Sequence, residues 1–274
     1  MKISILGTGW LGLPLGNYLI KKGHEVKGSI RTATKLDLLK TNGIEPFLLN
    51  LIPQPEPKGT IEKFLQSDVL IIGIPPSRKS DDMDTFHAAQ IQELVNHMLL
   101  GDIRKTIYIS STSVYPSTNG EVKESDEIKP EVSVHNAIVL AEKVLRQTGP
   151  LDTTVLRVGG LMGYNRIPGK YFAGKKGLKN GNSPVNFIHR DDVIGIIEQV
   201  ILQEKWNRVF NVVAPQHPIR KDLYPKTAIN FGFVPPEFDD SNPEPYKVVN
   251  TEKLDMELKY QFKYPDPFTF HYEL

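Results

Sequence analysis

Three glycines near the start of the chain have the spacing of a phosphate-binding turn. Gly7, Gly9 and Gly12 form a G-x-G-x-x-G pattern between an apolar run and a helical pattern. The first glycine permits a tight turn, the second lets a pyrophosphate approach the backbone, and the third allows a helix to pack closely on a strand. The N–H groups of Trp10 and Leu11 would face the phosphates at the start of that helix. This context favours a dinucleotide site over a purely structural turn.

The residues after the second apolar run indicate which dinucleotide fits. NAD sites typically place Asp or Glu here, on the ribose hydroxyls. In this chain the run Glu25-Gly28 continues into Ser29, Arg31 and Thr32, and no acidic residue follows until Asp37. Guanidinium and hydroxyl groups suit a 2′-phosphate. We therefore predict NADP in preference to NAD, although Arg31 could instead stack on adenine or face the solvent.

A serine-rich segment farther along the chain resembles that of a known family. Residues 108–115, YISSTSVY, resemble the nicotinamide-side segment of the extended short-chain dehydrogenase/reductase family, which includes NAD(P)-dependent epimerases and dehydratases. The similarity covers essentially the whole chain, in order, and is greatest to the atypical YeeZ-type branch. It rests on residues 9–12, Glu124, Pro130, Leu156-Arg157, Gly163, Pro168-Gly169, residues 172–175, residues 187–193, Phe210-Asn211 and residues 264–267.

The resemblance implies an active site with a missing part. Ser111 matches the family's active-site serine, which hydrogen-bonds a substrate oxygen. The family's acid/base motif, Tyr-x-x-x-Lys, is absent: its two positions fall on Val134 and Ile138. The remaining candidates for proton transfer are Tyr115, which could equally anchor its loop, and His135, which could equally be solvated.

Three functions are compatible with this pattern. The first, which we favour, is an oxidoreductase or epimerase with replaced acid/base groups that acts on a small polar metabolite. The second is a cofactor-binding sensor or regulatory protein without turnover, because loss of both acid/base partners would cripple the family's usual chemistry. The third is a reductase of the 6-phosphogluconate-dehydrogenase type, suggested by the glycine pattern and a downstream arginine. Neither the substrate nor its stereochemistry can be predicted.

Further candidates lie near the expected cofactor and substrate. Gly73 and Pro75 follow the fourth apolar run, and with Ser110 they are expected on the nicotinamide side of the cofactor. Arg166 and Tyr171 belong to a cationic, glycine-rich stretch that would suit a phosphorylated or acidic substrate, or would simply be a solvated loop. No spacing of His, Asp or Glu indicates a metal site.

The elements that must position these residues alternate between strand and helix. This alternation predicts an α/β fold, a doubly wound parallel Rossmann sheet, with a small C-terminal substrate-binding lobe. Residues 1–163 would form the dinucleotide-binding domain, to which 186–213 return, and 164–185 with 214–274 the lobe. Asp191 or Asp192 is expected to cap a helix that follows. The strands are expected at 3–6, 25–28, 45–49, 69–72, 106–109, 154–158, 185–188 and 209–213, and the helices at 13–22, 36–41, 84–99, 135–146 and 192–202.

Composition excludes several other classes of protein. The 274 residues include 33 Lys+Arg against 32 Asp+Glu and no cysteine, so polyanion binding and thiol chemistry are disfavoured. We expect a cytoplasmic protein that binds neither nucleic acid nor membrane. Apolar stripes on the 84–99 and 135–146 helices make a homodimer possible by resemblance, although burial against the sheet would explain them equally well.

Overall fold

The centre of the computed structural model is a seven-stranded sheet with the strand order β10-β7-β5-β4-β1-β2-β3. The model describes residues 1–274 except 53–58, 77–82, 130–132 and 134. Strand β1 pairs in parallel with both β2 and β4, which places the reversal of strand order between β1 and β4. The strands are β1 (Lys2–Leu6), β2 (Glu25–Ile30), β3 (Glu45–Leu48), β4 (Val69–Ile72), β5 (Lys105–Ser111), β7 (Asp152–Val158) and β10 (Val209–Val212).

The strand order confirms the predicted doubly wound α/β fold. Strand β4 is a continuous apolar run, and β1 is apolar at three of its five positions; both are buried along nearly their whole length, as parallel strands covered on both faces should be. In folds of this kind, ligands bind beyond the carboxyl ends of the strands where the order reverses. The ends of β1 and β4, at Leu6 and Ile72, therefore mark where a site is expected.

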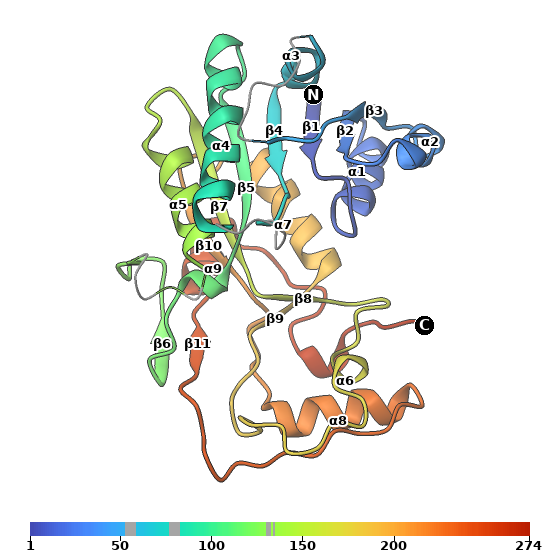
Figure 1. Cartoon of the computed structure of the whole chain (residues 1–274), viewed down its shortest axis with the longest axis vertical. Coiled ribbons are helices and arrows are strands. Elements are labelled where there is room, and N and C mark those ends of the chain that lie inside the picture. The colour runs from blue at the N-terminus through green and yellow to red at the C-terminus, as the bar shows by residue number, and fades with distance from the viewer. Residues whose placement is uncertain (53–58, 77–82, 130–132, 134) are drawn as a thin grey trace. The chain divides into compact units, whose positions relative to one another are not determined.

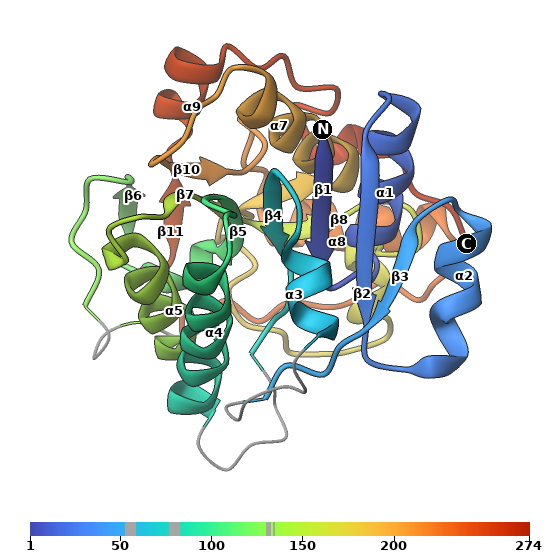
Figure 2. The same ribbon diagram turned by 90° about the horizontal axis from the view of Figure 1, so that it is seen from above.

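Helices cover both faces of the sheet. Seen from above in Figure 2, α3, α4 and α5 lie on one side of the strands and α1 lies on the other. Helices α4 and α5 pack against each other (Figure 1). No helix in the described ranges is long and apolar enough to cross a bilayer. The helices named here are α1 (Gly12–Lys21), α2 (Leu36–Thr41), α3 (Thr60–Leu65), α4 (Met83–Leu100) and α5 (Asn136–Gln147).

The apolar stripe of α5 is largely used within the chain. Ala137, Ala141 and Leu145 are fully buried, whereas Lys143 and Arg146 are exposed. This arrangement is the amphipathic pattern of a helix that packs on a sheet. It accounts for the stripe without a second subunit, and a homodimer stays a prediction.

The chain divides into two compact units that interleave along the sequence. Unit 1 comprises residues 1–114, 128–156 and 197–209, and unit 2 comprises 115–127, 157–196 and 210–274. Helix α7 (Arg190–Leu202) belongs partly to each unit. Unit 2 contains two small parallel sheets, one of β6 (Gly120–Val122) with β11 (Lys247–Val249), the other of β8 (Gly160–Met162) with β9 (Phe187–His189).

Unit 2 has more regular structure than its sequence predicted. The stretch 159–184, which contains none of the expected helices or strands, forms β8 and a short helix α6 (Pro168–Tyr171). A longer helix, α8 (Arg220–Asn230), forms although Pro225 lies inside it, and a further helix is α9 (Glu252–Leu258). Helices α6 and α8 pack so closely at Gly169 that a Cβ there would collide with the backbone of Ala228. Tertiary packing has overridden local propensity at these positions.

Candidate functional site

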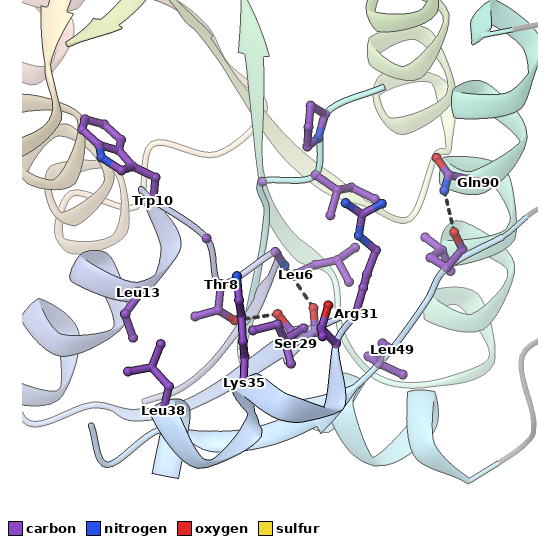
Figure 3. Close-up of a pocket in the computed structure, with 18 residues that line it drawn as sticks. Leu6, Thr8, Trp10, Leu13, Ser29, Arg31, Lys35, Leu38, Leu49 and Gln90 are labelled. Atoms are coloured by element: carbon purple, nitrogen blue, oxygen red, sulfur yellow. Dashed lines mark hydrogen bonds between the residues drawn. The ribbon is translucent and has the colours of Figure 1, made fainter. Parts of the chain in front are cut away.

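The glycine turn is fixed by the end of the neighbouring strand. Gly7 follows β1 with a φ of 100°, in the left-handed region that favours glycine. Its N–H donates to Ser29 Oγ at 3.0 Å, and the N–H and hydroxyl of Thr8 both donate to the Ser29 carbonyl, at 2.9 and 2.7 Å (Figure 3). Ser29 is buried in β2. Its hydroxyl therefore supports the turn, and its part in cofactor binding stays a prediction.

Each glycine of the pattern has a distinct geometric role. A Cβ on Gly12 would collide with the carbonyl oxygen of Gly7, and one on Gly7 would lie 3.1 Å from the backbone of Gly73. A Cβ on Gly9 would meet nothing within 4 Å, because Gly9 faces open space. The turn is therefore tight at its two ends and open in its middle. That arrangement fits a pyrophosphate placed on the backbone of Gly9.

The start of helix α1 offers backbone donors to a ligand only before Leu13. No side chain caps the helix at Leu11, the N–H of Leu13 already bonds to the Gly9 carbonyl at 3.0 Å, and Pro14 has no N–H. The positive end of the helix dipole adds an attraction for anions at the same place. The N–H of Leu11, one of the two predicted donors, therefore stays a predicted phosphate contact.

A cavity of about 540 Å³ opens beside this turn, entirely within unit 1. Its size is typical of small-molecule sites. Eight of the predicted cofactor residues line it, whereas Leu11, Gly12 and the buried Ser110 do not. The lining residues are Leu6, Gly7, Thr8, Gly9, Trp10, Leu13, Ser29, Ile30, Arg31, Thr32, Lys35, Leu38, Leu49, Leu51, Gly73, Ile74, Pro75 and Gln90 (Figure 3).

The charged groups at this cavity are cations. Arg31 and Lys35 come from the exposed segment after β2, and the lining described above includes no carboxylate. Among the described residues neither side chain has an ion-pair partner. The nearest acid in sequence, Asp37, pairs at 3.2 Å with Lys40. Lys35 was missed from the sequence because it lies four residues beyond Arg31, past the end of the strand.

The serines at the end of β5 differ in their surroundings. The Ser110 hydroxyl is buried and bonds at 2.5 Å to Glu142, so its side chain has no role in the cavity. Ser111 is half-buried, and its Oγ accepts from the N–H of Ser113 at 3.1 Å and lies 2.8 Å from that residue's hydroxyl. A serine hydroxyl supported in this way has a defined direction, as an orienting group requires.

Tyr115 is held in a buried network of unit 2. Its hydroxyl donates to Asn211 Oδ1 at 2.7 Å and accepts from Arg157 at 2.9 Å, and its side chain is fully buried. Burial raises the pKa of Tyr115 to about 12. Glu124 also joins this network, by accepting the N–H of Asn211. The geometry favours the anchoring role over the predicted proton transfer.

The other predicted acid/base candidates gain little support from the structure. His135 is exposed at the start of α5, and its backbone N–H bonds to Ser133. Ile138 is a buried apolar residue of α5, and Val134 lies outside the described residues.

Arg166 and Tyr171, the predicted substrate residues, both lie in unit 2. Arg166 closes a tight turn with Gly163 through two backbone hydrogen bonds, of 3.2 and 3.0 Å. Burial lowers the pKa of Arg166, and the positive charge of Arg190 adds to this effect. Arg190 in turn stacks on the Tyr164 ring of the same turn, 3.7 Å from its centroid. Tyr171 is largely exposed.

The two aspartates expected to cap α7 instead hold the C-terminal segment. The buried Asp192 accepts the N–H groups of Lys263 and Tyr264, at 2.7 and 3.1 Å, and the Tyr260 hydroxyl at 3.0 Å. Asp191 accepts from the Lys263 ammonium group. The capping prediction is therefore wrong, because both carboxylates bind residues some 70 positions farther along the chain.

His189, next to these aspartates, is buried and hydrogen-bonds through both ring nitrogens. Its Nδ1 accepts the N–H of Asp191 at 3.2 Å, so its Nε2–H donates to the carbonyl of His271, also at 3.2 Å. Its ring lies 4.0 Å from that of Tyr264. Burial lowers the pKa of His189 to about 4.

Comparisons with known proteins agree with this geometry. Residues 7–204 match the model of the NAD(P)H-binding family. The chain belongs to this family. It is 34% identical to the protein YeeZ of Escherichia coli K12, over 99% of both chains. This member of the family therefore binds NAD(P) and has an epimerase/dehydratase-like fold.

Solved structures of low identity share the fold. A UDP-glucuronic acid 4-epimerase from Bacillus cereus, in complex with UDP-glucuronic acid and NAD, has a TM-score of 0.78 at 18% identity and covers 96% of this chain and 95% of its own. A short-chain dehydrogenase/reductase superfamily protein from Agrobacterium tumefaciens, with bound NAD, has a TM-score of 0.79 at 17% identity, with 96% and 93% coverage.

The glycine turn yields a paired prediction. Gly9→Val should abolish cofactor binding with little change in melting temperature, since its side chain would occupy only the open space above the turn. Gly12→Val should lower the melting temperature by several degrees, because its side chain would collide with Gly7 inside the fold. Calorimetric titration and thermal unfolding check both variants. Wild-type cofactor affinity in Gly9→Val would contradict the assigned turn.

Buried His189 predicts a loss of stability in acid. Its folded pKa, about 4, lies below an unfolded value near 6.5. The unfolded chain therefore takes up a proton that the folded chain does not, and stability declines as the pH falls from about 6.5 toward 4, by on the order of 2 kcal/mol. Urea unfolding of wild type and His189→Gln between pH 7.5 and 5 should show a shallower pH dependence in the variant. Identical slopes would remove His189 as the cause.

Proposed function

We propose that the protein binds NADP(H) in preference to NAD(H) and acts as an oxidoreductase or epimerase on a small, polar, anionic metabolite. The observation that carries the cofactor preference is the composition of the cavity beside the glycine turn. It combines a backbone phosphate site with two cations, Arg31 and Lys35, and its described lining has no carboxylate.

Arg31 and Lys35 suit a 2′-phosphate for a simple electrostatic reason. An acid at this place accepts the ribose hydroxyls of NAD and repels the extra phosphate of NADP, whereas cations reverse both effects. A guanidinium supplies directed donors, and an ammonium group adds a mobile point charge. The structural relatives described above are named with NAD, so the preference rests on this chain's own residues.

The remaining roles follow from position and resemblance. The turn at Gly9 and the first N–H groups of α1 hold the pyrophosphate, and Gly73 and Pro75 line the cavity beyond it. The nicotinamide of the bound cofactor supplies hydride transfer. Ser111 orients a substrate oxygen, as its family counterpart does.

The charge of unit 2 supports an anionic substrate. Residues 157–190 contain seven Lys and Arg and no Asp or Glu. Arg166 and Arg190 lie close enough in this stretch for the charge of one to lower the pKa of the other. The B. cereus relative is named for a UDP-sugar acid, whose charges are of this kind. Such a compound is therefore a rational first substrate to test.

A second function is favoured by the missing acid/base pair. Tyr115 is committed to Arg157 and Asn211, and Ile138 is apolar. A protein that binds NADP(H) without turnover, as a sensor or regulatory partner, would need neither residue to transfer a proton.

Removing the two cations tests the cofactor preference. Arg31→Ala and Lys35→Ala should each raise the dissociation constant of NADPH roughly ten- to a hundredfold, because each loses a charge-assisted contact to the 2′-phosphate. The affinity for NADH should stay within about twofold, since NADH lacks that phosphate. Calorimetric titration of the wild type and of both variants with each of the two cofactors measures both effects.

Lys40→Ala is the matched control for these variants. Lys40 lies on α2, is exposed, pairs with Asp37 and does not line the cavity. Its replacement should leave both affinities unchanged. Equal affinities of the wild type for NADPH and NADH would rule out the proposed preference.

Turnover separates the enzyme from the sensor. A screen of sugar nucleotides and phosphorylated metabolites should reveal an activity. NADPH absorbance would detect oxidoreduction, and product analysis would detect epimerisation, which causes no net change in NADPH. Ser111→Ala should lower kcat at least tenfold, because the substrate loses its orienting hydrogen bond. Tyr115→Phe should lower stability but leave kcat within about twofold if the residue is an anchor, and lower kcat a hundredfold or more if it transfers a proton. Tight NADPH binding without turnover on any substrate class would favour the sensor.

A further inference from the structure

One amide side chain in the cavity is fixed in direction by buried neighbours. Gln90 of α4 lines the cavity and is seen beside the end of β3 in Figure 3. Its Nε2–H donates to the carbonyl of Leu51 at 2.5 Å, and its Oε1 lies 3.3 Å from Nδ1 of His87. This residue could not be identified as a site residue from the sequence, since a glutamine in a helix is common.

The direction of the amide follows from a chain of hydrogen bonds. Because Gln90 Oε1 can only accept, His87 Nδ1 must carry the proton and donate it. The other ring nitrogen, Nε2, then accepts from the hydroxyl of Tyr108 at 3.1 Å. Both His87 and Tyr108 are fully buried, so no water competes for these bonds. A reversed amide would set a donor against His87 and an acceptor against Leu51.

Two hydrogen-bonding valences of Gln90 are left over. One N–H of Nε2 and one lone pair of Oε1 remain after the bonds to Leu51 and His87 are made. The other uncharged polar groups near the turn, Thr8 and Ser29, bond to the backbone. Gln90 is the only amide side chain in the described lining, and leucines surround it on the cavity wall.

A donor and an acceptor fixed side by side match one edge of adenine. A glutamine amide can bind adenine through the exocyclic amino group, which donates, and an adjacent ring nitrogen, which accepts. Hypoxanthine, with a carbonyl in place of the amino group and a proton on N1, presents the opposite pattern. Only a reversed amide would suit it, and a reversed amide would turn its oxygen toward the Leu51 carbonyl, which can only accept a hydrogen bond.

We propose that Gln90 is the residue that recognises the adenine base, with its amide direction set by the Leu51 carbonyl and with His87 as a positioning residue beside it. The proposal rests on the proposed cofactor function, because it concerns the base of the same dinucleotide. It adds a contact specific for the base to a site whose other features are the glycine turn, two cations and an apolar lining.

Binding of two cofactors tests the proposal. The wild type should bind NADPH about tenfold tighter than the nicotinamide hypoxanthine dinucleotide phosphate, which differs only in the base. Gln90→Leu should bind the two within about twofold of each other, mainly through weaker binding of NADPH. Dissociation constants from calorimetric titration give all of these ratios.

Gln92→Leu is the matched control. Gln92 lies two residues farther along α4, is exposed and bonds at 3.2 Å to Asn96, so its replacement should preserve the tenfold ratio. A tenfold ratio that persists in Gln90→Leu, in protein that still prefers NADPH over NADH, would overturn the proposal. A wild type that binds NADPH but does not distinguish the bases would also overturn it and leave the cofactor function intact. Failure of the wild type to bind either NADPH or NADH would instead refute the function itself.

Discussion

The candidate site depends on the hydrogen bonds that join the glycine turn to Ser29. Two successive residues of the turn, Gly7 and Thr8, donate three bonds to this one residue at the end of β2. Because Ser29 is buried, these bonds form away from competing water. They fix the position of the turn relative to β2. The cations that follow Ser29 in sequence, Arg31 and Lys35, line the same cavity as the turn. A single residue thus joins the glycine turn to the segment that carries both cations.

The sequence predicted the backbone well wherever its conformation depends on neighbouring residues in the chain. The run of apolar residues at 69–72 could only be a covered parallel strand, and β4 has the same bounds. The glycine turn was equally predictable, because its conformation depends on the absence of side chains. Unit 2 was harder to predict, since α8 forms in spite of Pro225 and is stabilised by its packing on Gly169. Such packing brings together residues that are far apart in the chain.

The side-chain chemistry of the site was less predictable than its backbone. Arg31 was found because it follows a strand directly, whereas Lys35 and Gln90 reach the same cavity from other elements. Tyr115 was selected because it ends the serine-rich segment, yet its hydrogen bonds depend on Asn211, which lies 96 residues away. Asp192 was misread for the same reason. A helix cap is a local arrangement, but a carboxylate can find better donors in a distant segment.

The bonds of Asp192 have a consequence for how the chain folds during synthesis. Its backbone partners at Lys263 and Tyr264 leave the ribosome after 71 and 72 further residues have been added. Until then α7 carries a carboxylate that cannot be buried without losing its solvation. Unit 1 is complete earlier in synthesis than unit 2, because its last segment ends at residue 209. All residues of unit 1 are therefore synthesised before the backbone partners of the Asp192 carboxylate, so unit 1 can fold while unit 2 is still incomplete.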